Sequence, residues 1–290
     1  MRLLVVGATG LVGSHLLRAL GPLGDVRGTF STAPAAGLHP LDLRDRAAVE
    51  AHVRAVKPEV ILCAAAIAWA ETCEREPNRT RAVNVVGVAN LVDAARAIGA
   101  IFVYFSSDYV FDGSAGPYAE DDHVAPINEY GRQKVAAEGL VRGAKRFLIC
   151  RTSGVFGQEA RRKNFVYQVI DRLRDGRIME AADDQIICPT WAVELAEAVH
   201  DLLAARARGV VHVVAPEPLT RAAFAHTVAR AFGLDERLVR GVPTAQLGLA
   251  APRPHNTALR DERLRELIGR RLSRPEVALA KLRASLELTH

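Results

Sequence analysis

Lysine is scarce in this chain, and its scarcity bears on which partners the positive charge can serve. Of the 38 basic residues 5 are lysine, at positions 57, 134, 145, 163 and 281, so 33 are arginine. The arginines are scattered among acidic residues, and no basic arm interleaved with aromatic residues occurs. A nucleic-acid partner is therefore not expected. The formal net charge of +5 suits an anionic nucleotide or nucleotide-sugar instead.

Long apolar runs are also missing. No stretch approaches the roughly 18 apolar residues of a membrane span. Met1 and Arg2 lead directly into a strand-like run, which leaves no room for a signal peptide. We therefore expect a cytoplasmic protein that has no membrane partner.

Cysteine is sparse, and the spacings typical of metal ligands do not occur. The cysteines are widely separated, as expected of reduced residues in a core: Cys63, Cys73, Cys150 and Cys188. Nine histidines occur without an H-x-H or H-E-x-x-H pattern or a cysteine partner. The sequence therefore predicts no dedicated metal site.

Apolar runs rich in β-branched residues alternate with helical patterns. Strands are expected at residues 3–6, 26–30, 60–63, 101–106, 147–150 and 210–214. Helices are expected at residues 11–20, 46–56, 79–98, 128–142, 164–174, 192–204 and 221–232. Continuous apolar strands separated by helices favour an α/β fold, in which a doubly wound parallel sheet of the Rossmann type is covered on both faces.

The alternation thins after about residue 150, where prolines and loops become frequent. We interpret residues 1–150 as a dinucleotide-binding Rossmann domain and residues 151–290 as a smaller C-terminal α/β substrate-binding region. The strand expected at 210–214 returns to the main sheet, so the division is not a clean cut along the chain.

The first strand ends in a glycine-rich turn that opens a helix. Glycine permits a tight turn and a close approach of backbone to a pyrophosphate, which the helix N-terminus attracts. The predicted contacts come from Gly7, Thr9, Gly10, Leu11, Val12 and Gly13. The alternative is a strand-to-helix corner with a purely structural role.

Hydroxyl groups close the fourth strand, and a Tyr-x-x-x-Lys pair follows. Tyr130 and Lys134 are four residues apart, so on a helix they share a face. A nearby ammonium lowers the pKa of a phenol, which makes Tyr130 a candidate for proton transfer. The spacing alone also fits a solvated helix face. Ser106 and Ser107 lie at the carboxyl edge of the sheet, where ligands bind in such folds.

The end of the second strand bears on the choice of cofactor. An acid there commonly bonds the ribose 2′-hydroxyl of NAD, but the run 27–32 contains none. Ser31, Thr32 and a basic neighbour such as Arg27 could accept a 2′-phosphate. We therefore favour NADP(H), with NAD(H) as the second candidate.

These motifs resemble the extended short-chain dehydrogenases/reductases, and within them the dTDP-4-dehydrorhamnose reductase family. The resemblance is carried by residues 7–13, 106–113, 130–134, 151–157, 163–166, 184–185 with 189–190, and 253–256. It implies reduction, by a nicotinamide cofactor, of the 4-keto group of a nucleotide-linked 6-deoxy sugar in rhamnose biosynthesis.

The resemblance also implies roles for individual residues. Catalysis is assigned to Ser107, Tyr130 and Lys134, with Tyr130 protonating the ketone oxygen, Ser107 holding that oxygen and Lys134 bonding the nicotinamide ribose. Further cofactor contacts are implied for Ser31, Asp42, Leu43, Ala64, Ala65, Ala66, Tyr130 and Lys134. Asp42 has a second interpretation, as the cap of the following helix. Substrate contacts are predicted for Ser107, Asp108, Tyr109 and Arg253, with Arg253 on the diphosphate because a guanidinium matches phosphate oxygens. The alternatives are that Arg253 is a solvent-exposed loop arginine and that Asp108 or Tyr109 only stabilises the turn after the strand.

Three positions depart from the pattern of that family. Ser107 stands where the family usually has threonine, which keeps the hydroxyl. Gly154 stands where a tryptophan usually contacts the sugar, and residues 66–71 also differ. Trp69 could replace the lost stacking surface. The alternative is a tryptophan that only packs in the core.

Other functions share parts of this motif set. The regulatory β subunit of methionine adenosyltransferase is similar and keeps the Tyr and Lys, so a nucleotide-binding interaction protein is the main alternative. A sugar-nucleotide 4-epimerase would use the same three residues. A 4,6-dehydratase is disfavoured, because Tyr109 occupies the position of its second carboxylate. A homodimer is one assembly open to such a protein.

Overall fold

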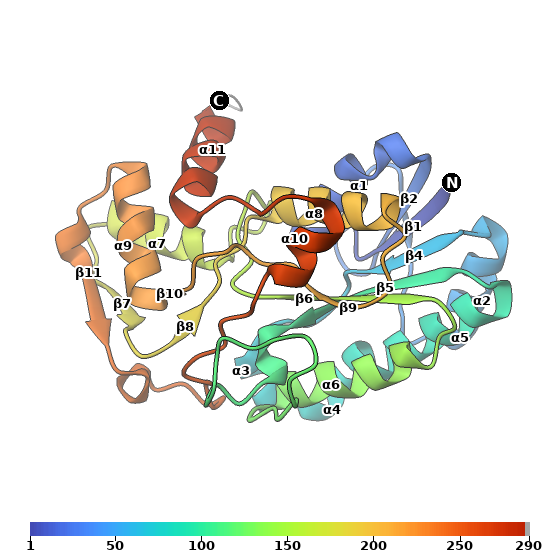
Figure 1. Cartoon of the computed structure of the whole chain (residues 1–290), viewed down its shortest axis with the longest axis horizontal. Coiled ribbons are helices and arrows are strands. Elements are labelled where there is room, and N and C mark those ends of the chain that lie inside the picture. The colour runs from blue at the N-terminus through green and yellow to red at the C-terminus, as the bar shows by residue number, and fades with distance from the viewer. Residues whose placement is uncertain (288–290) are drawn as a thin grey trace.

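A seven-stranded parallel sheet forms the centre of the molecule (Figure 1). The computed structural model describes residues 1–287. The strands run in the order β3-β2-β1-β4-β5-β6-β9, and every neighbouring pair is parallel. They comprise β1 (Arg2–Val6), β2 (Asp25–Phe30), β3 (Leu38–Pro40), β4 (Val60–Cys63), β5 (Ile101–Ser107), β6 (Phe147–Thr152) and β9 (Gly209–His212). The predicted doubly wound fold is therefore confirmed.

Helices cover both faces of this sheet, which explains why its strands are apolar at successive positions. Leu3 and Val5 of β1 pack with α1 (Leu11–Ala19) and α8 (Ala192–Ala204). Leu4 and Val6 face the opposite layer. That layer consists of α2 (Arg46–Val56), α5 (Val88–Ile98) and α6 (Glu129–Arg142).

The chain reverses its direction of travel across the sheet between β1 and β4. From β1 it moves outward to β2 and β3, and then returns to place β4 on the other side of β1. Parallel sheets bind ligands beyond the strand ends at such a switch point, because the two connections leave in opposite directions and open a crevice. The predicted glycine turn and the Ala64 segment both lie at this point.

The helix expected at residues 79–98 is longer and less regular than the sequence pattern indicates. It is assembled from α4 (Pro77–Arg81), a π-helical segment (Ala82–Gly87) and α5. A widened turn of this kind is rare and often occurs near functional sites. Asn84 lies within it and is buried.

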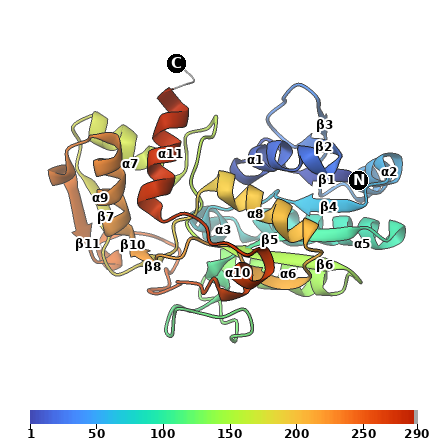
Figure 2. The same ribbon diagram turned by 45° about the horizontal axis from the view of Figure 1, so that its top comes forward.

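A smaller lobe stands beside the carboxyl edge of the sheet (Figure 2). Its core joins α7, α9, α11, β7 and β11. The elements are α7 (Phe165–Arg174), β7 (Met179–Ala182), β8 (Ile186–Ile187), β10 (Leu219–Thr220), α9 (Arg221–Phe232), β11 (Val239–Val242) and α11 (Pro275–Glu287). Two further helices are α3 (Ala70–Arg75) and α10 (Glu262–Ile268), and α10 packs on α8 and β9.

The expected return of the chain to the main sheet occurs through β9, which pairs with β6. Residues 192–212 thus belong to the large sheet layer, although they follow residue 150. The domain boundary at residue 150 remains a prediction. No helix within residues 1–287 has the length and apolar character that crossing a membrane requires.

Candidate active site

The turn after β1 is built so closely that two of its glycines admit no side chain. Gly7 has φ +85°, and a Cβ atom there would lie 2.7 Å from the backbone of Ala65. A Cβ on Gly13 would lie 2.2 Å from the Gly7 carbonyl oxygen. These glycines leave the backbone of the turn without side chains, so a flat or charged ligand can approach it directly.

The helix that follows presents its N-terminus to the same crevice. α1 begins after Gly10; within residues 1–287 no side chain caps it, and its first turn carries no acid. Unpaired N–H groups and the partial positive charge of a helix N-terminus attract phosphate. Together with the bare glycine turn at the switch point, this fits the pyrophosphate of a dinucleotide held by the residues expected from 7–13.

The contacts of Asp42, in the segment after β3, exclude one of its two interpretations. Asp45, not Asp42, caps α2, because its carboxylate accepts the N–H of Ala48 at 3.0 Å. Asp42 instead accepts hydrogen bonds from the side chain of Arg44, which lower its pKa. The capping interpretation of Asp42 is wrong, and its contact with adenine stays a prediction.

Helix α6 carries Tyr130 and Lys134 to the end of β5. Asn128 caps this helix by accepting the N–H of Gly131 at 2.9 Å. Lys134 is buried, and its Nζ donates to the Phe105 carbonyl oxygen at 2.7 Å. The same Nζ lies 5.6 Å from the centre of the Tyr130 ring. The structure thus brings Ser107, Tyr130 and Lys134 together as the sequence predicted, on two adjacent elements.

The Ser107 hydroxyl is held by its neighbour. Its Oγ donates to Oδ1 of Asp108 at 2.8 Å and accepts the N–H of Tyr109 at 3.2 Å. Asp108 Oδ2 accepts from Ser153 and from Thr257, each at 2.7 Å. Asp108 is 4% exposed, and burial raises its pKa although the three hydroxyls oppose this. Its carboxylate therefore joins three separate chain segments.

The pKa of Tyr130 does not move in the direction that the sequence suggested. Burial raises it above its ordinary value, and the negative charge of Asp108 raises it further. The Ser107 side chain acts in the opposite direction but does not outweigh these effects. The expected lowering by Lys134 is therefore wrong for this structure. The raised pKa keeps the phenol protonated at neutral pH but makes it a weaker acid, because a general acid works best when its pKa lies near the operating pH.

Lys134 shows the complementary effect. Burial lowers its pKa to about 8, because the charged ammonium loses its hydration. Glu138, one further turn along α6, acts to keep it charged. The ammonium is thus protonated at neutral pH but close to losing its proton in mildly alkaline solution.

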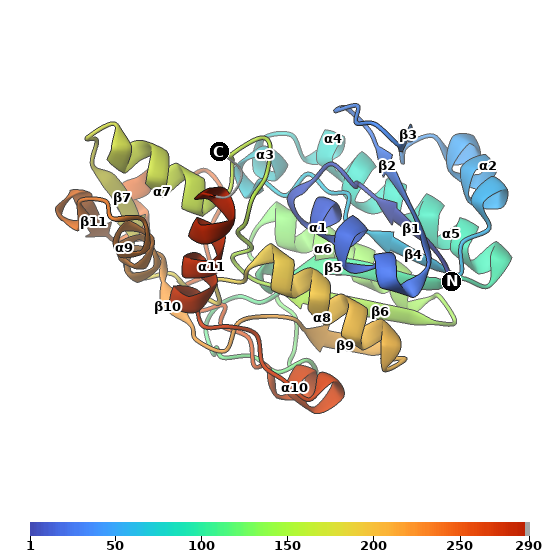
Figure 3. The same ribbon diagram turned by 90° about the horizontal axis from the view of Figure 1, so that it is seen from above.

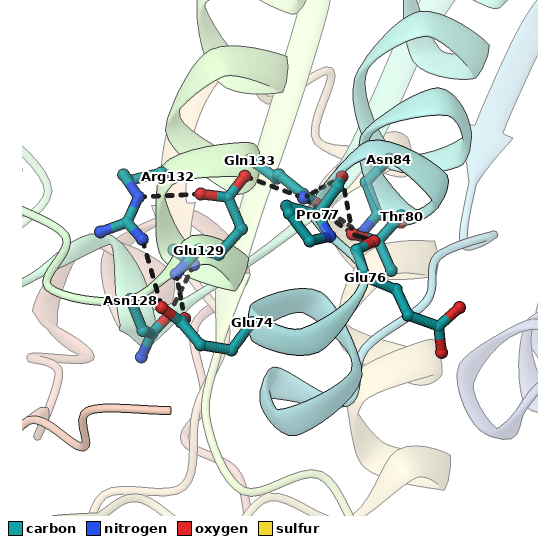
Figure 4. A network of polar contacts seen from close by, with 10 residues as sticks. Glu74, Glu76, Pro77, Thr80, Asn84, Asn128, Glu129, Arg132 and Gln133 are labelled. Carbon is teal, nitrogen blue, oxygen red and sulfur yellow. Dashed lines mark hydrogen bonds and ion pairs between the residues drawn. The ribbon is translucent and has the colours of Figure 1, made fainter. Parts of the chain in front are cut away.

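A polar network absent from the sequence predictions holds α6 in place (Figure 4). Gln133 Nε2 donates to Thr80 Oγ1 at 2.9 Å and to Glu129 Oε1 at 3.0 Å. Gln133 Oε1 accepts from Asn84 Nδ2 at 2.8 Å. Asn84 also exchanges hydrogen bonds with the backbone of Ile67, in the segment after β4. The π-helical segment, α6 and the segment after β4 are therefore linked through the side-chain amides of Asn84 and Gln133.

The Arg253 side chain lies beside Tyr109, and two of its nitrogens already donate hydrogen bonds within the protein. Its Nη1 donates to the Tyr109 hydroxyl at 3.0 Å, and its Nη2 donates to Glu71 Oε1 at 2.9 Å. Glu71 also accepts the backbone N–H groups of Ala250 and Ala251. Arg253 is 15% exposed, and its Nε is buried with no hydrogen-bond partner among the described residues.

Comparisons with known proteins identify the family. The family model described as "RmlD substrate binding domain" matches residues 1–287. The dTDP-4-dehydrorhamnose reductase of Streptomyces griseus is 38% identical over 272 residues, which cover 90% of this chain and 86% of the relative. The dTDP-4-keto-6-deoxy-D-glucose reductase of Streptomyces niveus is 34% identical, with 91% of this chain and 90% of the relative covered.

The chain belongs to the RmlD substrate-binding domain family. A solved structure agrees with this: the dTDP-4-dehydrorhamnose reductase of Bacillus anthracis, in complex with NADP, has a TM-score of 0.90. It is 27% identical, and 98% of this chain and 99% of that chain are covered. The predicted family is confirmed, as is the prediction of an NAD(P)-dependent oxidoreductase of the extended short-chain dehydrogenase/reductase type.

The backbone conformation at position 154 favours glycine over the tryptophan that the family usually has there. Gly154 has φ +53°, and a Cβ there would lie 2.9 Å from Ile187 Cδ1. A tryptophan would therefore need both a strained backbone and displacement of Ile187. Trp69 is 47% exposed, so its interpretation as a packed core residue is wrong. The family pattern has a tryptophan at position 154. This chain has glycine there and carries an exposed tryptophan at position 69 instead.

Proposed function

We propose that this chain reduces the 4-keto group of a nucleotide-linked 6-deoxy sugar with NADPH. The observation that carries the proposal is the meeting of Ser107, Tyr130 and Lys134 beside a glycine turn that admits a dinucleotide. The names of the two Streptomyces relatives refer to dTDP-linked sugars with a 4-dehydro or 4-keto group. They differ in the sugar, and the proposal covers both substrates.

In the proposed reaction, Tyr130 donates its proton to the ketone oxygen. The bound cofactor supplies a hydride to the carbonyl carbon. Burial and Asp108 keep the phenol protonated until the oxygen gains negative charge. Lys134, whose Nζ donates to the Phe105 carbonyl oxygen, would hold a hydroxyl of the nicotinamide ribose and places a positive charge near the phenol. Ser107 keeps its proton and donates a hydrogen bond to the same ketone oxygen.

Ser107 must change partner to do so, because its proton now points to Asp108. Rotation about the Cβ–Oγ bond is enough, and Asp108 keeps the two hydrogen bonds from Ser153 and Thr257. We therefore assign Asp108 a positioning role in addition to the sugar contact predicted from the sequence.

Arg253 is proposed to bind the substrate's diphosphate. A guanidinium offers a fork of donors that matches phosphate oxygens. Its unpartnered Nε leaves one donor free, and exchange of Glu71 for a phosphate would free a second. Tyr109, bonded to Nη1, would then border the sugar.

The test is to incubate the purified chain with NADPH and dTDP-4-keto-6-deoxy sugars and to follow the loss of nicotinamide absorbance with the identity of the product. Tyr130→Phe should lower kcat by about 10² to 10⁴-fold, since it removes the general acid. Its affinity for NADPH, measured by fluorescence titration, should stay near that of the unaltered chain.

Turnover by Tyr130→Phe at the unaltered rate would refute this mechanism. Tight NADPH binding without reduction of any sugar in the panel would instead favour a nucleotide-binding regulatory subunit. Conversion of a 4-hydroxy sugar into its epimer, with no net cofactor consumption, would favour the epimerase.

A further inference from the structure

The loop between β6 and α7 passes beside the first turns of α1 (Figure 3). A Cβ on Gly157 would lie 3.6 Å from Leu11 Cδ1. The carbonyl oxygen of Gln158 lies 3.1 Å from Nε2 of His15. Burial lowers the pKa of His15, so at neutral pH this ring is an uncharged donor to that carbonyl. The loop is thus anchored on the helix that opens the dinucleotide site.

The base of this loop is also braced. Glu159 Oε1 accepts the backbone N–H of Lys163, at 2.8 Å, together with the backbone N–H and side-chain amide of Asn164. These bonds turn the chain between residues 159 and 164. The hydrogen bonds to Glu159 therefore orient the residues at the tip of the loop, which do not pack in the core.

Arg161 extends from the tip to the end of β2. Its Nη2 donates to Thr32 Oγ1 at 3.3 Å, a contact between residues 129 positions apart. Within residues 1–287 Arg161 forms no ion pair, so its charge is not neutralised by a carboxylate. Its neighbour Arg162 makes other contacts. It forms an ion pair with Asp171, and its guanidinium lies 4.1 Å from the centre of the Tyr167 ring.

The end of β2 offers no competing negative charge. Ser31 and Thr32 are exposed, and no acid follows the strand before residue 42. Arg27, which the sequence suggested as the basic partner of a 2′-phosphate, pairs with Asp25 on the same strand at 3.1 Å. It also lies opposite Leu4 in the middle of the sheet, not at its carboxyl edge. This placement does not favour Arg27 for that role, because an extended strand carries its middle residues away from the edge.

We propose that Arg161 and Thr32 bind the 2′-phosphate of NADP(H). The ribose of the adenosine half lies at the end of the second strand in this fold, where the 2′ substituent decides between the two cofactors. A guanidinium and a hydroxyl supply donors to a doubly charged phosphate, whereas the neutral 2′-hydroxyl of NADH gains little from the positive charge. The arginine thus comes from a distant loop instead of from the second strand. The inference rests on the nicotinamide cofactor of the proposed function but not on the identity of the sugar.

Cofactor binding by the purified chain tests this without any sugar. Dissociation constants for NADPH and NADH are measured by nicotinamide fluorescence for the unaltered chain, Arg161→Ala and Arg162→Ala. We expect Arg161→Ala to weaken NADPH at least tenfold and to change the NADH constant less than twofold. Arg162→Ala removes the same charge from the same loop and should change neither constant by more than about twofold.

Two further measurements address the phosphate directly. Competition by 2′,5′-ADP should be stronger than by 5′-ADP in the unaltered chain, and Arg161→Ala should abolish the difference. Thr32→Asp, which places a carboxylate beside Arg161, should reverse the preference in favour of NADH.

Equal losses of NADPH affinity in Arg161→Ala and Arg162→Ala would overturn the proposal, since they would indicate only a general effect of charge. Equal affinities of the unaltered chain for NADPH and NADH would overturn it as well. Failure to reduce a sugar would leave these binding results intact, so the two proposals fail separately.

Discussion

Tyr130 and Lys134 share one helix face, yet burial shifts their pKa values in opposite directions. The phenol keeps its proton more firmly than usual, while the ammonium holds its proton less firmly. Both shifts follow from the same cause, because a low-dielectric site disfavours whichever form carries charge. The pair is thus an acid beside a cation that can still be titrated near physiological pH.

Lys134 gives the site a measurable pH dependence. Its ammonium contributes to cofactor binding only while protonated, so we expect NADPH affinity to decline as the pH rises through about 8. A fluorescence titration of the cofactor from pH 6 to 9.5 measures this. Lys134→Met should bind weakly throughout and show no inflection. A flat curve for the unaltered chain would show that Lys134 does not control binding.

The same shift has a defined sign for stability. The folded-state pKa of Lys134 is below the ordinary lysine value, so between about 8 and 10.5 the unfolded chain binds more protons. The contribution of Lys134 to the free energy of unfolding is therefore unfavourable below pH 8 and diminishes as the pH rises toward 10.5.

Asp108 allows positioning to be separated from substrate binding. Asp108→Asn keeps the shape but weakens the acceptors for Ser107, Ser153 and Thr257. Since a hydrogen bond to a charged group is worth about 1.5–3 kcal/mol, we expect kcat to fall roughly tenfold to hundredfold. KM for the sugar should change little if the role is positioning. Steady-state kinetics check this, and a rise in KM at constant kcat would favour the direct sugar contact.

Helix α6 is fastened to the sheet by a buried ion pair behind the reacting groups. Arg151 on β6 donates to both carboxylate oxygens of Glu138 at 2.9 Å. Ser106 Oγ donates to the same carboxylate at 2.6 Å. The end of β5 therefore holds Glu138 through Ser106 and Lys134 through the Phe105 carbonyl, which sets the register of α6 against the strand.

Breaking this pair should be costly. Glu138→Gln leaves the Arg151 guanidinium buried without its charge partner, and we expect a loss of about 3–5 kcal/mol in the free energy of unfolding. Urea denaturation measures the change. Arg142→Ala is the matched control, because Arg142 also pairs with Glu138, at 3.6 Å, but is half-exposed. Exposed pairs contribute about 0–1 kcal/mol. Similar losses in both variants would contradict the buried role.

Elements with a strong periodic pattern were predicted well, and the others were not. The α6 boundaries agree with the sequence because Asn128 caps the start of the helix. Strand β3 was missed because it has three residues and includes Pro40, so it shows no alternation. The π-helical segment is expected to be ordinary helix because it lies inside a longer helical pattern, and its widened backbone turn is seen only in the structure.

At the scale of the whole molecule, the site is closed by a segment that returns from the C-terminal part of the chain. Asn128 Nδ2 donates to the Pro252 carbonyl oxygen at 2.9 Å, and Tyr118 N–H donates to that of Ala258 at 2.8 Å. Thr257 Oγ1 donates the third hydroxyl hydrogen bond that the Asp108 carboxylate accepts. The substrate side of the crevice therefore depends on contacts between distant parts of the sequence.

Arg253 provides the test at this scale. Arg253→Ala should raise KM for the nucleotide-sugar roughly tenfold to hundredfold, since a charged hydrogen bond is lost. The dissociation constant for NADPH should stay the same, because Arg253 contacts Glu71 and Tyr109, not the glycine turn. Steady-state kinetics and cofactor titration give the two values. An unchanged KM would remove Arg253 from the substrate site.

The sequence by itself determined the sheet, the glycine turn and the pairing of Tyr130 with Lys134. These follow from apolar periodicity and from spacings of a few residues, which local backbone geometry converts directly into shared faces and strand ends. The tertiary structure decided the direction of the Tyr130 pKa, the hydroxyl cluster around Asp108 and the reach of Arg161 to Thr32. Desolvation and contacts between residues far apart in the chain arise only when separate elements pack, so no local pattern encodes them.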